Sequence, residues 1–479
     1  MTRRTKIIAT IGPASESDAQ IKAMIEAGMD VARLGLAHGT LEQNLDRLHR
    51  IRAAAAAYGR PVGLLVDLPG PKVRTGAFPE EGSFLEDGSE LRLLPGNDPS
   101  DASLIHVDYE SVATDVQVGD ALAIGDGAVL IEVVDRGRDE LRARVLHGGL
   151  VKGRPGIHIP SEHMRLNTPT AEDLRLLDAF IEVDVDMVAI SFVRSAHDVR
   201  KIGTEPHPRG PLVVAKIETR AAVENLEGII EASGAVMVAR GDLGSECPIE
   251  ELPHLQKRII RTCIALGRPA ITATQMLESM VHAPAPTRAE ASDIANAIFD
   301  GSSVLMLSAE TAIGRDPVLA VATMARIAER ADQMFDYAGW ARGLTDTVRR
   351  TNSVDEGDAI TDAMTSAAWR ATIEVKPTAI ICISRTGFTV RSIARFRPDV
   401  PILGFSQDER TVRQLTMSWG STPILLDPSA AGVDEMVEAA LASALRLGHV
   451  RRGDLVAILA GSDDVEVRAT DTLKLKRVP

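Results

Sequence analysis

The sequence predicts an α/β protein built on a TIM (β/α)8 barrel, with a small β-barrel lid domain inserted into it and an α/β domain at the C-terminal end. Three observations lead to this fold class. Short apolar runs alternate with segments of helical spacing, and such runs between helices are typical of buried parallel strands. The alternation breaks once, across residues 75–160, which are rich in Gly, Asp and Glu and carry short β-like pieces. Around this break the pattern supplies eight strand–helix units, the number that closes a TIM barrel.

Each of the eight expected strands is an apolar run that ends in turn or polar residues. The third of them ends at Asp67, where the regular alternation stops. Two of the helices that follow strands begin at capping boxes, Thr40 with Gln43 and Thr287 with Glu290, in which side chains satisfy the first free N–H groups. The expected strands are residues 6–11, 31–36, 62–68, 187–192, 212–217, 235–239, 270–273 and 304–307.

The break and the end of the barrel pattern define the predicted domains. Inside the insertion, Asp126-Gly127 lies between two β-like runs and is a hairpin signal. The insertion follows a strand end directly, which favours a lid over a site, and a passive insertion is the alternative. Residues 338–352 are interpreted as a linker to a further α/β unit with strands near 378–383, 400–405, 422–426, 454–460 and 472–478. The predicted domains are the barrel in two parts, residues 1–74 and 161–340, the lid, residues 75–160, and a C-terminal regulatory-type domain, residues 353–479.

Composition narrows the partners of the chain. The formal net charge of −14 argues against nucleic acid or an anionic membrane as a general partner, so an anionic ligand needs a local basic pocket. Three widely spaced cysteines form neither a disulfide framework nor a zinc pattern, and we expect a reducing cytoplasmic location. No apolar stretch reaches the length of a membrane span, and the basic start lacks a signal-peptide core.

Two neighbouring strands end abruptly in charge. The fifth strand ends in Lys216 and Glu218, and the sixth in Arg240, Gly241 and Asp242. Two carboxylates and an ammonium at one rim could hold a divalent metal and an anionic substrate, and Mg²⁺ typically takes one or two carboxylates and leaves other positions to water and substrate. For either run alone, a structural salt bridge is an equally good interpretation.

The other strand ends are polar as well, and barrel active sites lie at the C-terminal ends of the strands. Several cations around two carboxylates suit a phosphate or carboxylate bound through a metal. Phosphoryl transfer asks mainly for such positioning and for neutralisation of charge on the transferred group. The remaining strand-end residues are Arg33, then Asp67 with Lys72 and Arg74 just beyond it, Ser191 and Arg194, Thr274 and Gln275, and Ser308 and Glu310.

Seven stretches of the chain, in this order, resemble pyruvate kinase over nearly the whole length. The resemblance implies transfer of the phosphoryl group of phosphoenolpyruvate to ADP, giving pyruvate and ATP in glycolysis, with Mg²⁺ or Mn²⁺ as cofactor. It also implies a homotetramer. The stretches are KIIATIGPAS (6–15), GPKVRTG (70–76), AKIE (215–218), MVARGDLG (237–244), ATQMLESM (273–280), PTRAE (286–290) and MLSAETAIG (306–314).

The resemblance also implies a role for each matching residue. Arg33 would hold the substrate phosphoryl group, and Lys216 would stabilise it in flight, as a compact ammonium can. Arg74 would contact nucleotide phosphates, and Glu310 would support the site structurally. The metal would be bound by Glu218 and Asp242, and the carboxylate end of the substrate would be oriented by Gly241, Asp242 and Thr274, with Thr274 near the route by which the enolate gains its proton.

One group of departures from the family pattern concerns its monovalent cation. The family's Asn and Ser, whose oxygens bind K⁺, are Gly35 and Ala37 in this chain, and neither has a side-chain oxygen. Where potassium-dependent members carry Glu, this chain has Lys72, as in members that work without a monovalent cation. We therefore expect an Asp67–Lys72 pair in place of the ion, and activity that does not require K⁺. The alternative is a solvated surface lysine.

Other departures lie in the lid and the C-terminal domain. A family lysine that reaches ADP from the lid is replaced by Pro155, which carries no charge, so Arg154 or Lys152 would have to stand in. The loop 384–389 lies between a strand and a helix and is interpreted either as an anion nest for a phosphorylated effector or as an ordinary turn. The closing stretch 461–472 departs from the usual Gly-rich loop.

Three functions are compatible with these features. The leading one is a working pyruvate kinase. The second is a catalytically weakened paralogue with a binding or regulatory role, suggested by Gly35, Ala37 and Pro155. The third is another phosphoenolpyruvate- or pyruvate-handling barrel enzyme such as a lyase, although the lid and Arg74 speak against it because a lyase needs no second phosphate site.

Overall fold

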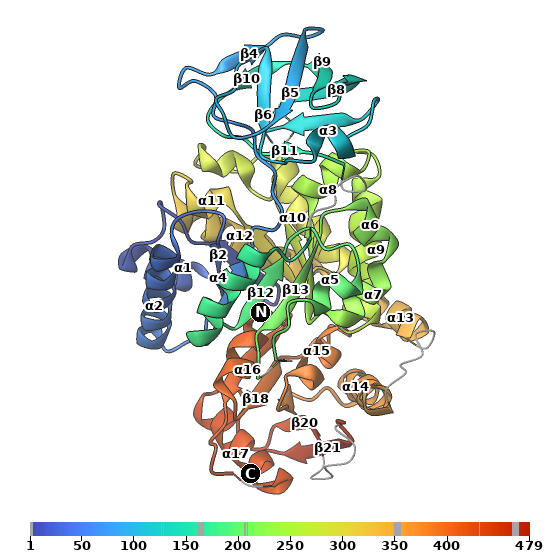
Figure 1. Cartoon of the computed structure of the whole chain (residues 1–479). Helices are drawn as coiled ribbons and strands as arrows, with labels where there is room; N and C mark the ends of the chain where they lie inside the picture. The colour runs from blue at the N-terminus through green and yellow to red at the C-terminus, as the bar shows by residue number, and fades with distance from the viewer. Residues whose placement is uncertain are drawn as a thin grey trace.

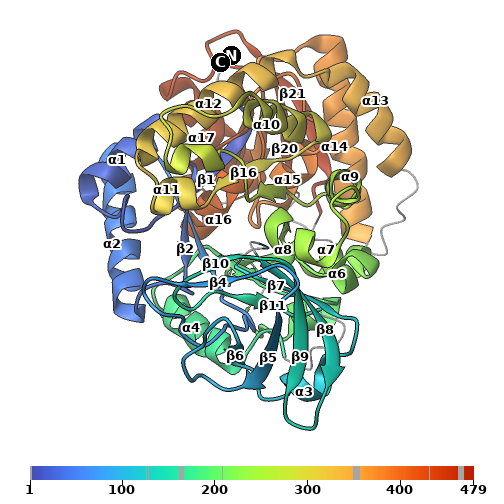
Figure 2. The same cartoon turned by 90° about the horizontal axis from the view of Figure 1, so that it is seen from above.

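The computed structural model describes residues 3–125, 127, 129–160, 167–205, 207, 209–348, 356–430, 432–461 and 469–479. Three bodies follow one another in space: a β domain, a barrel and an α/β domain at the opposite end of the barrel (Figure 1). Seen from above, the β domain lies to one side of the barrel (Figure 2). No helix within the described ranges combines the length and the apolar composition needed to cross a membrane.

The barrel is closed by eight parallel strands in the order β1-β16-β15-β14-β13-β12-β3-β2, which confirms the predicted fold class. Their apolar residues face two ways. Ile8, Leu65 and Met237 belong to the core inside the barrel, whereas Ile7, Leu64 and Val236 belong to the layer between the strands and the outer helices. The strands are β1 (Lys6–Thr10), β2 (Val31–Gly35), β3 (Gly63–Asp67), β12 (Met187–Ile190), β13 (Leu212–Ile217), β14 (Ala235–Ala239), β15 (Ala270–Ala273) and β16 (Val304–Leu307).

The helices between the strands begin where the sequence predicts. Both expected capping boxes are present, with Thr40 and Gln43 at the second helix and Thr287 and Glu290 at the tenth. The barrel helices are α1 (Asp18–Ala27), α2 (Leu41–Tyr58), α4 (Ala171–Glu182), α5 (Ala196–Arg200), α6 (Arg220–Glu224), α7 (Leu226–Ala232), α8 (Arg240–Glu246), α9 (Leu252–Ala265), α10 (Arg288–Asp300), α11 (Ala309–Ala312) and α12 (Pro317–Met334), with a 3₁₀ turn η1 (Glu278–Val281).

The inserted domain is a six-stranded sheet in the order β11-β7-β8-β9-β5-β6, with a two-stranded sheet of β10 and β4 beside it. Alternate residues of its strands form a separate apolar core. The expected hairpin residue Asp126 lies outside the described residues, between β7 and β8. The elements are β4 (Ser83–Leu85), β5 (Glu90–Pro95), β6 (Leu104–Val107), α3 (Val112–Asp115), β7 (Ala121–Ile124), β8 (Val129–Arg136), β9 (Leu141–His147), β10 (Gly149–Val151) and β11 (Ile157–His158).

The segment after the barrel differs from the prediction. Residues 338–352 were expected to be a linker, yet most of them form helix α13 (Tyr337–Val348). Trp340, Ala341 and Leu344 share one helix face, on which Ala341 and Leu344 are buried, and the Trp340 indole N–H donates to the Arg395 carbonyl at 2.9 Å. Packing of this apolar face therefore stabilises a helix where the loosened sequence pattern predicted a linker.

The C-terminal domain is a five-stranded sheet in the order β19-β18-β17-β20-β21, of which only β21 runs antiparallel among the described strands. An ion pair and a hydrogen bond tie this domain to the N-terminal ends of the barrel strands: Arg413 Nε lies 2.7 Å from the buried Asp186 carboxylate, and Lys6 Nζ donates to the Ser421 carbonyl at 2.8 Å. The elements are α14 (Glu356–Val375), β17 (Ala379–Ile383), α15 (Phe388–Ala394), β18 (Ile402–Ser406), α16 (Glu409–Gln414), η2 (Leu415–Met417), β19 (Ser421–Leu425), α17 (Val433–Arg446), β20 (Leu455–Ala460) and β21 (Thr472–Arg477).

Candidate active site at the rim of the barrel

A charged cluster lies where β3, β12 and β13 end side by side. Lys216 Nζ lies 2.8 Å from Glu218 Oε1, 3.3 Å from Asp67 Oδ1 and 2.8 Å from Ser191 Oγ. Ser191 in turn donates to the Leu68 carbonyl at 2.7 Å, so the ammonium has a fixed hydroxyl partner. Three strands that are far apart in the sequence thus hold one lysine in a single place.

Arg33 approaches the same cluster from β2. Its Nε donates to Asp67 Oδ2 at 2.7 Å, and its Nη1 donates to the Thr10 hydroxyl at 2.9 Å. The two oxygens of Asp67 are therefore divided between Arg33 and Lys216. The Asp67 side chain is 3% exposed, whereas that of Arg33 is 19% exposed and retains access to a ligand.

Mutual charge sets the ionisation of this cluster. Burial by itself would raise the pKa of Asp67, but the charges of Lys216 and Arg33 outweigh burial and hold that pKa below its usual value. Burial likewise opposes the charge of Lys216, and the carboxylates of Asp67, Glu218 and Asp242 overcome it and raise the pKa of Lys216 well above its ordinary value. Lys216 is therefore a permanent cation at neutral pH.

In contrast to Asp67, Glu218 lies in surroundings that disfavour the charged form of its carboxylate. Burial raises the pKa of Glu218 to about 7, Lys216 opposes this shift, and the neighbouring Asp242 adds to it. Glu218 Oε2 accepts the Phe192 N–H at 2.7 Å, whereas Oε1 lies 2.8 Å from Lys216 Nζ and has no well-oriented hydrogen bond within the part of the chain that is described. An oxygen of this kind, next to a second carboxylate, fits a hard divalent cation.

The described residues contain no cluster of three or more His, Cys, Asp or Glu side chains that could form a metal cage. Two carboxylates are what Mg²⁺ usually takes from a protein when substrate and water supply the other oxygens. The residues present at the rim therefore fit a magnesium ion that is shared with an anionic substrate.

Thr274, at the end of β15, faces the start of α8. Its hydroxyl accepts the Gly241 N–H at 2.9 Å and donates to the Ala273 carbonyl at 2.6 Å. Thr274 and Gln275 adopt φ values of 66° and 54°, a region that side-chain-bearing residues enter only when their surroundings enforce it.

Arg240 supplies that enforcement, a role the sequence analysis did not assign. Its guanidinium donates to the carbonyls of Ala273 at 3.2 Å and Thr274 at 2.6 Å, and it is anchored by Asp293 at 2.6 Å. It therefore clamps the loop rather than facing a ligand. The position after the strand predicts a charged residue at the rim, but no sequence signal tells which way it turns.

The expected pair of Asp67 and Lys72 is not present among the described residues. Both oxygens of Asp67 are engaged by Arg33 and Lys216, and Lys72 is exposed in the turn that follows β3. A Cβ at Gly156 would lie 3.0 Å from Lys72 Cε, which places the Lys72 stem against the return of the lid to the barrel. Partial burial together with the charges of Arg74, Arg33 and Lys72 lowers the pKa of His38, so Lys72 still belongs to the electrostatic surroundings of the rim.

Arg74 lies in the segment after β3 that leads from the barrel into the lid. Its Nη1 donates to the Arg154 carbonyl at 3.3 Å, beside a backbone bridge between Arg74 and Gly156. Arg154, one of the two side chains expected to stand in for the missing lysine at Pro155, is already bound to Asp108 at 3.2 Å and to Asn97 at 2.7 Å. Lys152 is exposed.

Two further strand-end residues serve the framework. Glu310 is buried and accepts the N–H groups of Leu277 at 3.0 Å and Ser308 at 2.7 Å, which ties the ends of β15 and β16 together. Arg194 turns away toward Asp198 on α5, at 3.5 Å. Both were among the rim residues predicted from the sequence.

Comparison with known proteins shows similarity to pyruvate kinases over nearly the whole chain. The family descriptions "Pyruvate kinase, barrel domain" and "Pyruvate kinase, alpha/beta domain" match residues 2–321 and 362–476. The chain is 40% identical to a pyruvate kinase of Geobacillus stearothermophilus, covering 99% of this chain and 80% of that protein. It is 37% identical to one of Mycobacterium intracellulare, covering 100% and 99%. The crystal structure of a pyruvate kinase from Cryptosporidium parvum superposes with a TM-score of 0.89 at 31% identity, covering 100% of this chain and 96% of that one.

The fold and the rim together define a three-domain barrel protein with a charged cluster at the C-terminal ends of its strands. Matches of this extent settle the family. The chain belongs to the pyruvate kinase family.

Proposed function

We propose that the cluster of Arg33, Asp67, Lys216 and Glu218 is the centre at which this chain performs the family's reaction. Pyruvate kinases are phosphotransferases that move the phosphoryl group of phosphoenolpyruvate to ADP, and the chain is an enzyme of this class over its whole length. The observation that carries the proposal is Lys216, a largely buried cation that three neighbouring strand ends hold between the carboxylates of Asp67 and Glu218.

The two cations divide the work on the phosphoryl group. Arg33 is fixed through Nε and Nη1, and its partly exposed guanidinium binds the phosphoryl group before transfer. The Lys216 ammonium is held in one position by its three partners. It therefore needs no reorientation to stabilise the negative charge that develops on the transferred group. Asp67 holds both cations at the required separation, which makes it a positioning residue.

Family members generally use Mg²⁺, and Glu218 and Asp242 are the residues that would hold it. When bound, the ion supplies charge neutralisation for the carboxylate and phosphoryl oxygens of the substrate. At the other end of the substrate, the Gly241 backbone and the Thr274 hydroxyl are locked to one another at 2.9 Å and orient the carboxylate. The Thr274 hydroxyl would also lie near the route by which the enolate gains its proton.

The nucleotide would enter between the rim and the lid, where Arg74 contacts its phosphates. Pro155 supplies no charge there, and the Arg154 guanidinium is engaged by Asp108 and Asn97. Arg74 and the exposed Lys152 therefore carry the contacts with ADP from the lid side.

Independence from K⁺ is part of the proposal. Gly35 and Ala37 offer no side-chain oxygen, and the Asp67 carboxylate is already neutralised by two cations. Lys72 adds a tethered positive charge near Arg33 and His38 without pairing with Asp67. A homotetramer, a cytoplasmic location and a phosphorylated effector at the loop 384–389 complete the proposal by analogy with the family.

One assay series tests the function. Pyruvate formation from phosphoenolpyruvate, coupled to NADH oxidation, should require both ADP and Mg²⁺ and should change less than about twofold when K⁺ replaces a tetraalkylammonium ion at fixed ionic strength. Pyruvate formation without ADP would indicate a lyase, and binding of phosphoenolpyruvate without turnover would indicate a weakened paralogue. Strong activation by K⁺ would refute the cation proposal alone.

A further inference from the structure

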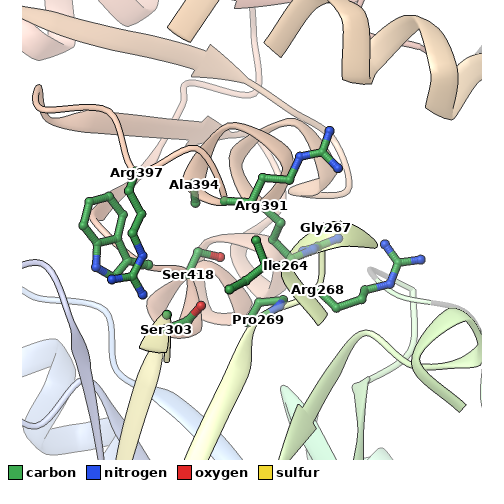
Figure 3. A pocket seen from close by; sticks show the side chains of 12 residues that line it. Ile264, Gly267, Arg268, Pro269, Ser303, Arg391, Ala394, Arg397 and Ser418 are labelled. Carbon is green, nitrogen blue, oxygen red and sulfur yellow. The ribbon is translucent and has the colours of Figure 1, made fainter. Parts of the chain in front are cut away.

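A small cavity of about 20 Å³ lies between the barrel and the C-terminal domain, at the end of the barrel opposite the active site (Figure 3). One wall is the turn from α9 to β15, with Gly267 and Arg268. The facing wall is α15, with Arg391 and Arg395. An interface between two domains is a place where a ligand can bind to both at once.

Arg391 is a buried cation without an anionic partner among the described residues. It is 4% exposed, its Nη2 donates to the Thr386 carbonyl at 3.1 Å, and its Nε and Nη1 have no hydrogen-bond partner within the described ranges. Gly387, at φ +75°, leaves room for this group, because a Cβ there would lie 2.9 Å from Nη1. Burial lowers the pKa of Arg391 to about 9, and the charge of Arg268 adds to that effect, so the guanidinium is still charged at neutral pH.

Arg268 brings a second cation from the barrel side. Its Nε donates to the Ser233 carbonyl at 2.9 Å, and its guanidinium carbon lies 5.8 Å from the centre of the Phe388 ring at the start of α15. The side chains of Arg268 and Arg391 extend on the same side of the cavity, whereas Arg397 extends on the other (Figure 3). Arg268 is only partly buried, so this side of the interface is open to solvent.

His207 is close enough to both cations for their charges to act on it. Among the described residues its Nδ1 is buried without a hydrogen-bond partner, and burial together with the charges of Arg391 and Arg268 lowers the pKa of His207 to about 3. The imidazole is therefore neutral and adds no third positive charge to the surroundings of the two arginines.

The other two arginines of the cavity have partners that offset their charge or bind their guanidinium nitrogens, although Arg395 Nε is left without a hydrogen bond among the described residues. Arg395 pairs with Asp362 at 2.5 Å, and Arg397 donates to the carbonyls of Ile298 and Ser302 and lies over three aromatic rings. A water molecule could fill the vacant hydrogen bonds of Arg391 but could not neutralise its charge. An anion does both, and guanidinium groups bind phosphate oxygens in a forked geometry.

We propose that a phosphate group, free or as a small monoester, binds between Arg268 of the barrel and Arg391 of the C-terminal domain. Such a ligand would bridge the two domains far from the catalytic rim. The proposal does not depend on the assignment of catalytic residues.

The test is the melting temperature of the full chain during titration with inorganic phosphate, at constant ionic strength set by NaCl and without divalent cations. The wild-type melting temperature should rise with phosphate. In Arg391→Met and Arg268→Met the half-maximal concentration should increase at least about tenfold, the effect of one lost charge-assisted hydrogen bond. Arg451→Met on the exposed surface is the matched control that should keep the wild-type response.

Arg391→Met should also melt no lower than the wild type when phosphate is absent, because it removes a buried charge without a partner. A lower melting temperature there, or an undiminished phosphate response in both arginine variants, would overturn the proposal. The partly exposed Arg268 keeps the test informative if residue 391 tolerates no change. Glycerol phosphate as a second probe separates the sources: a response to it at lower concentration than to inorganic phosphate identifies a monoester site, and an equal response identifies the phosphate group alone.

Discussion

Replacing Lys216 with Met is the sharpest perturbation of the proposed centre. Met has a similar length and fills the same slot between β12 and β13, so the change removes a charge rather than volume. The ammonium it removes contacts Asp67, Glu218 and Ser191 within 3.3 Å. Asp67 keeps Arg33 as its partner, which protects the framework of the site from collapse.

The magnitude follows from the charges. Two cations, Arg33 and Lys216, face three carboxylates, Asp67, Glu218 and Asp242, so the formal sum is 2 − 3 = −1, and it becomes −2 in the variant. A unit charge about 4 Å from the transferred group is worth about 4 kcal/mol at an effective dielectric constant of about 20. That corresponds to a fall in kcat of about 10³-fold.

The assay is the coupled measurement of pyruvate at saturating phosphoenolpyruvate and ADP, repeated over a range of Mg²⁺ concentrations. Lys257→Met, which removes a lysine from the outer helix α9, is the matched control and should keep wild-type kcat. Circular dichroism should show unchanged secondary structure in both variants. A loss smaller than about tenfold, or one that excess Mg²⁺ fully restores, would refute a direct role, because Lys216 would then only neutralise the metal-binding carboxylates.

Two further variants test the supports of the site. Arg240→Lys keeps the charge but loses the forked contacts with the carbonyls of Ala273 and Thr274. We expect kcat to fall about 10²-fold with little change in KM for ADP. An unchanged kcat would show that the backbone at Thr274 keeps its conformation without Arg240. Glu310→Gln removes one of two acceptors for buried N–H groups and should lower stability by about 1–3 kcal/mol, seen as faster thermal inactivation; wild-type inactivation would show that the bonds to Leu277 and Ser308 are not needed.

The barrel could be predicted because its signals are local. Each strand is an apolar run buried on both faces, and each strand end is marked by the residue that breaks the run. The closed eight-stranded order brings β2, β3, β12 and β13 next to one another, which is why Arg33, Asp67 and Lys216 meet although they lie far apart in the sequence. The number of strands and the residues at their ends were therefore sufficient to predict the barrel and the cluster at its rim.

The direction of side chains beyond the strand ends could not be predicted. Lys72 and Arg33 are both cations within reach of the rim, but only Arg33 projects from a strand that pairs with β3. Arg240 and Arg194 also follow strands, and both turn toward acidic partners outside the cluster. These choices depend on Asp293 and Asp198, whose positions are set by helix packing rather than by any local pattern.

The state of Asp67 joins the catalytic proposal to the cation proposal. An oxygen site for K⁺ near this carboxylate would need negative charge to spare, and Asp67 has none once Arg33 and Lys216 hold its two oxygens. A free K⁺ would therefore bind weakly there. The ammonium of Lys72, in contrast, is covalently attached and supplies a positive charge without binding an ion. The aliphatic part of the Lys72 side chain passes beside Gly156, where the chain returns from the lid to the barrel. The Lys72 charge therefore stays at the mouth of the site at any K⁺ concentration. On this proposal, Arg33 and Lys216 occupy the carboxylate that an exchangeable cation would otherwise use.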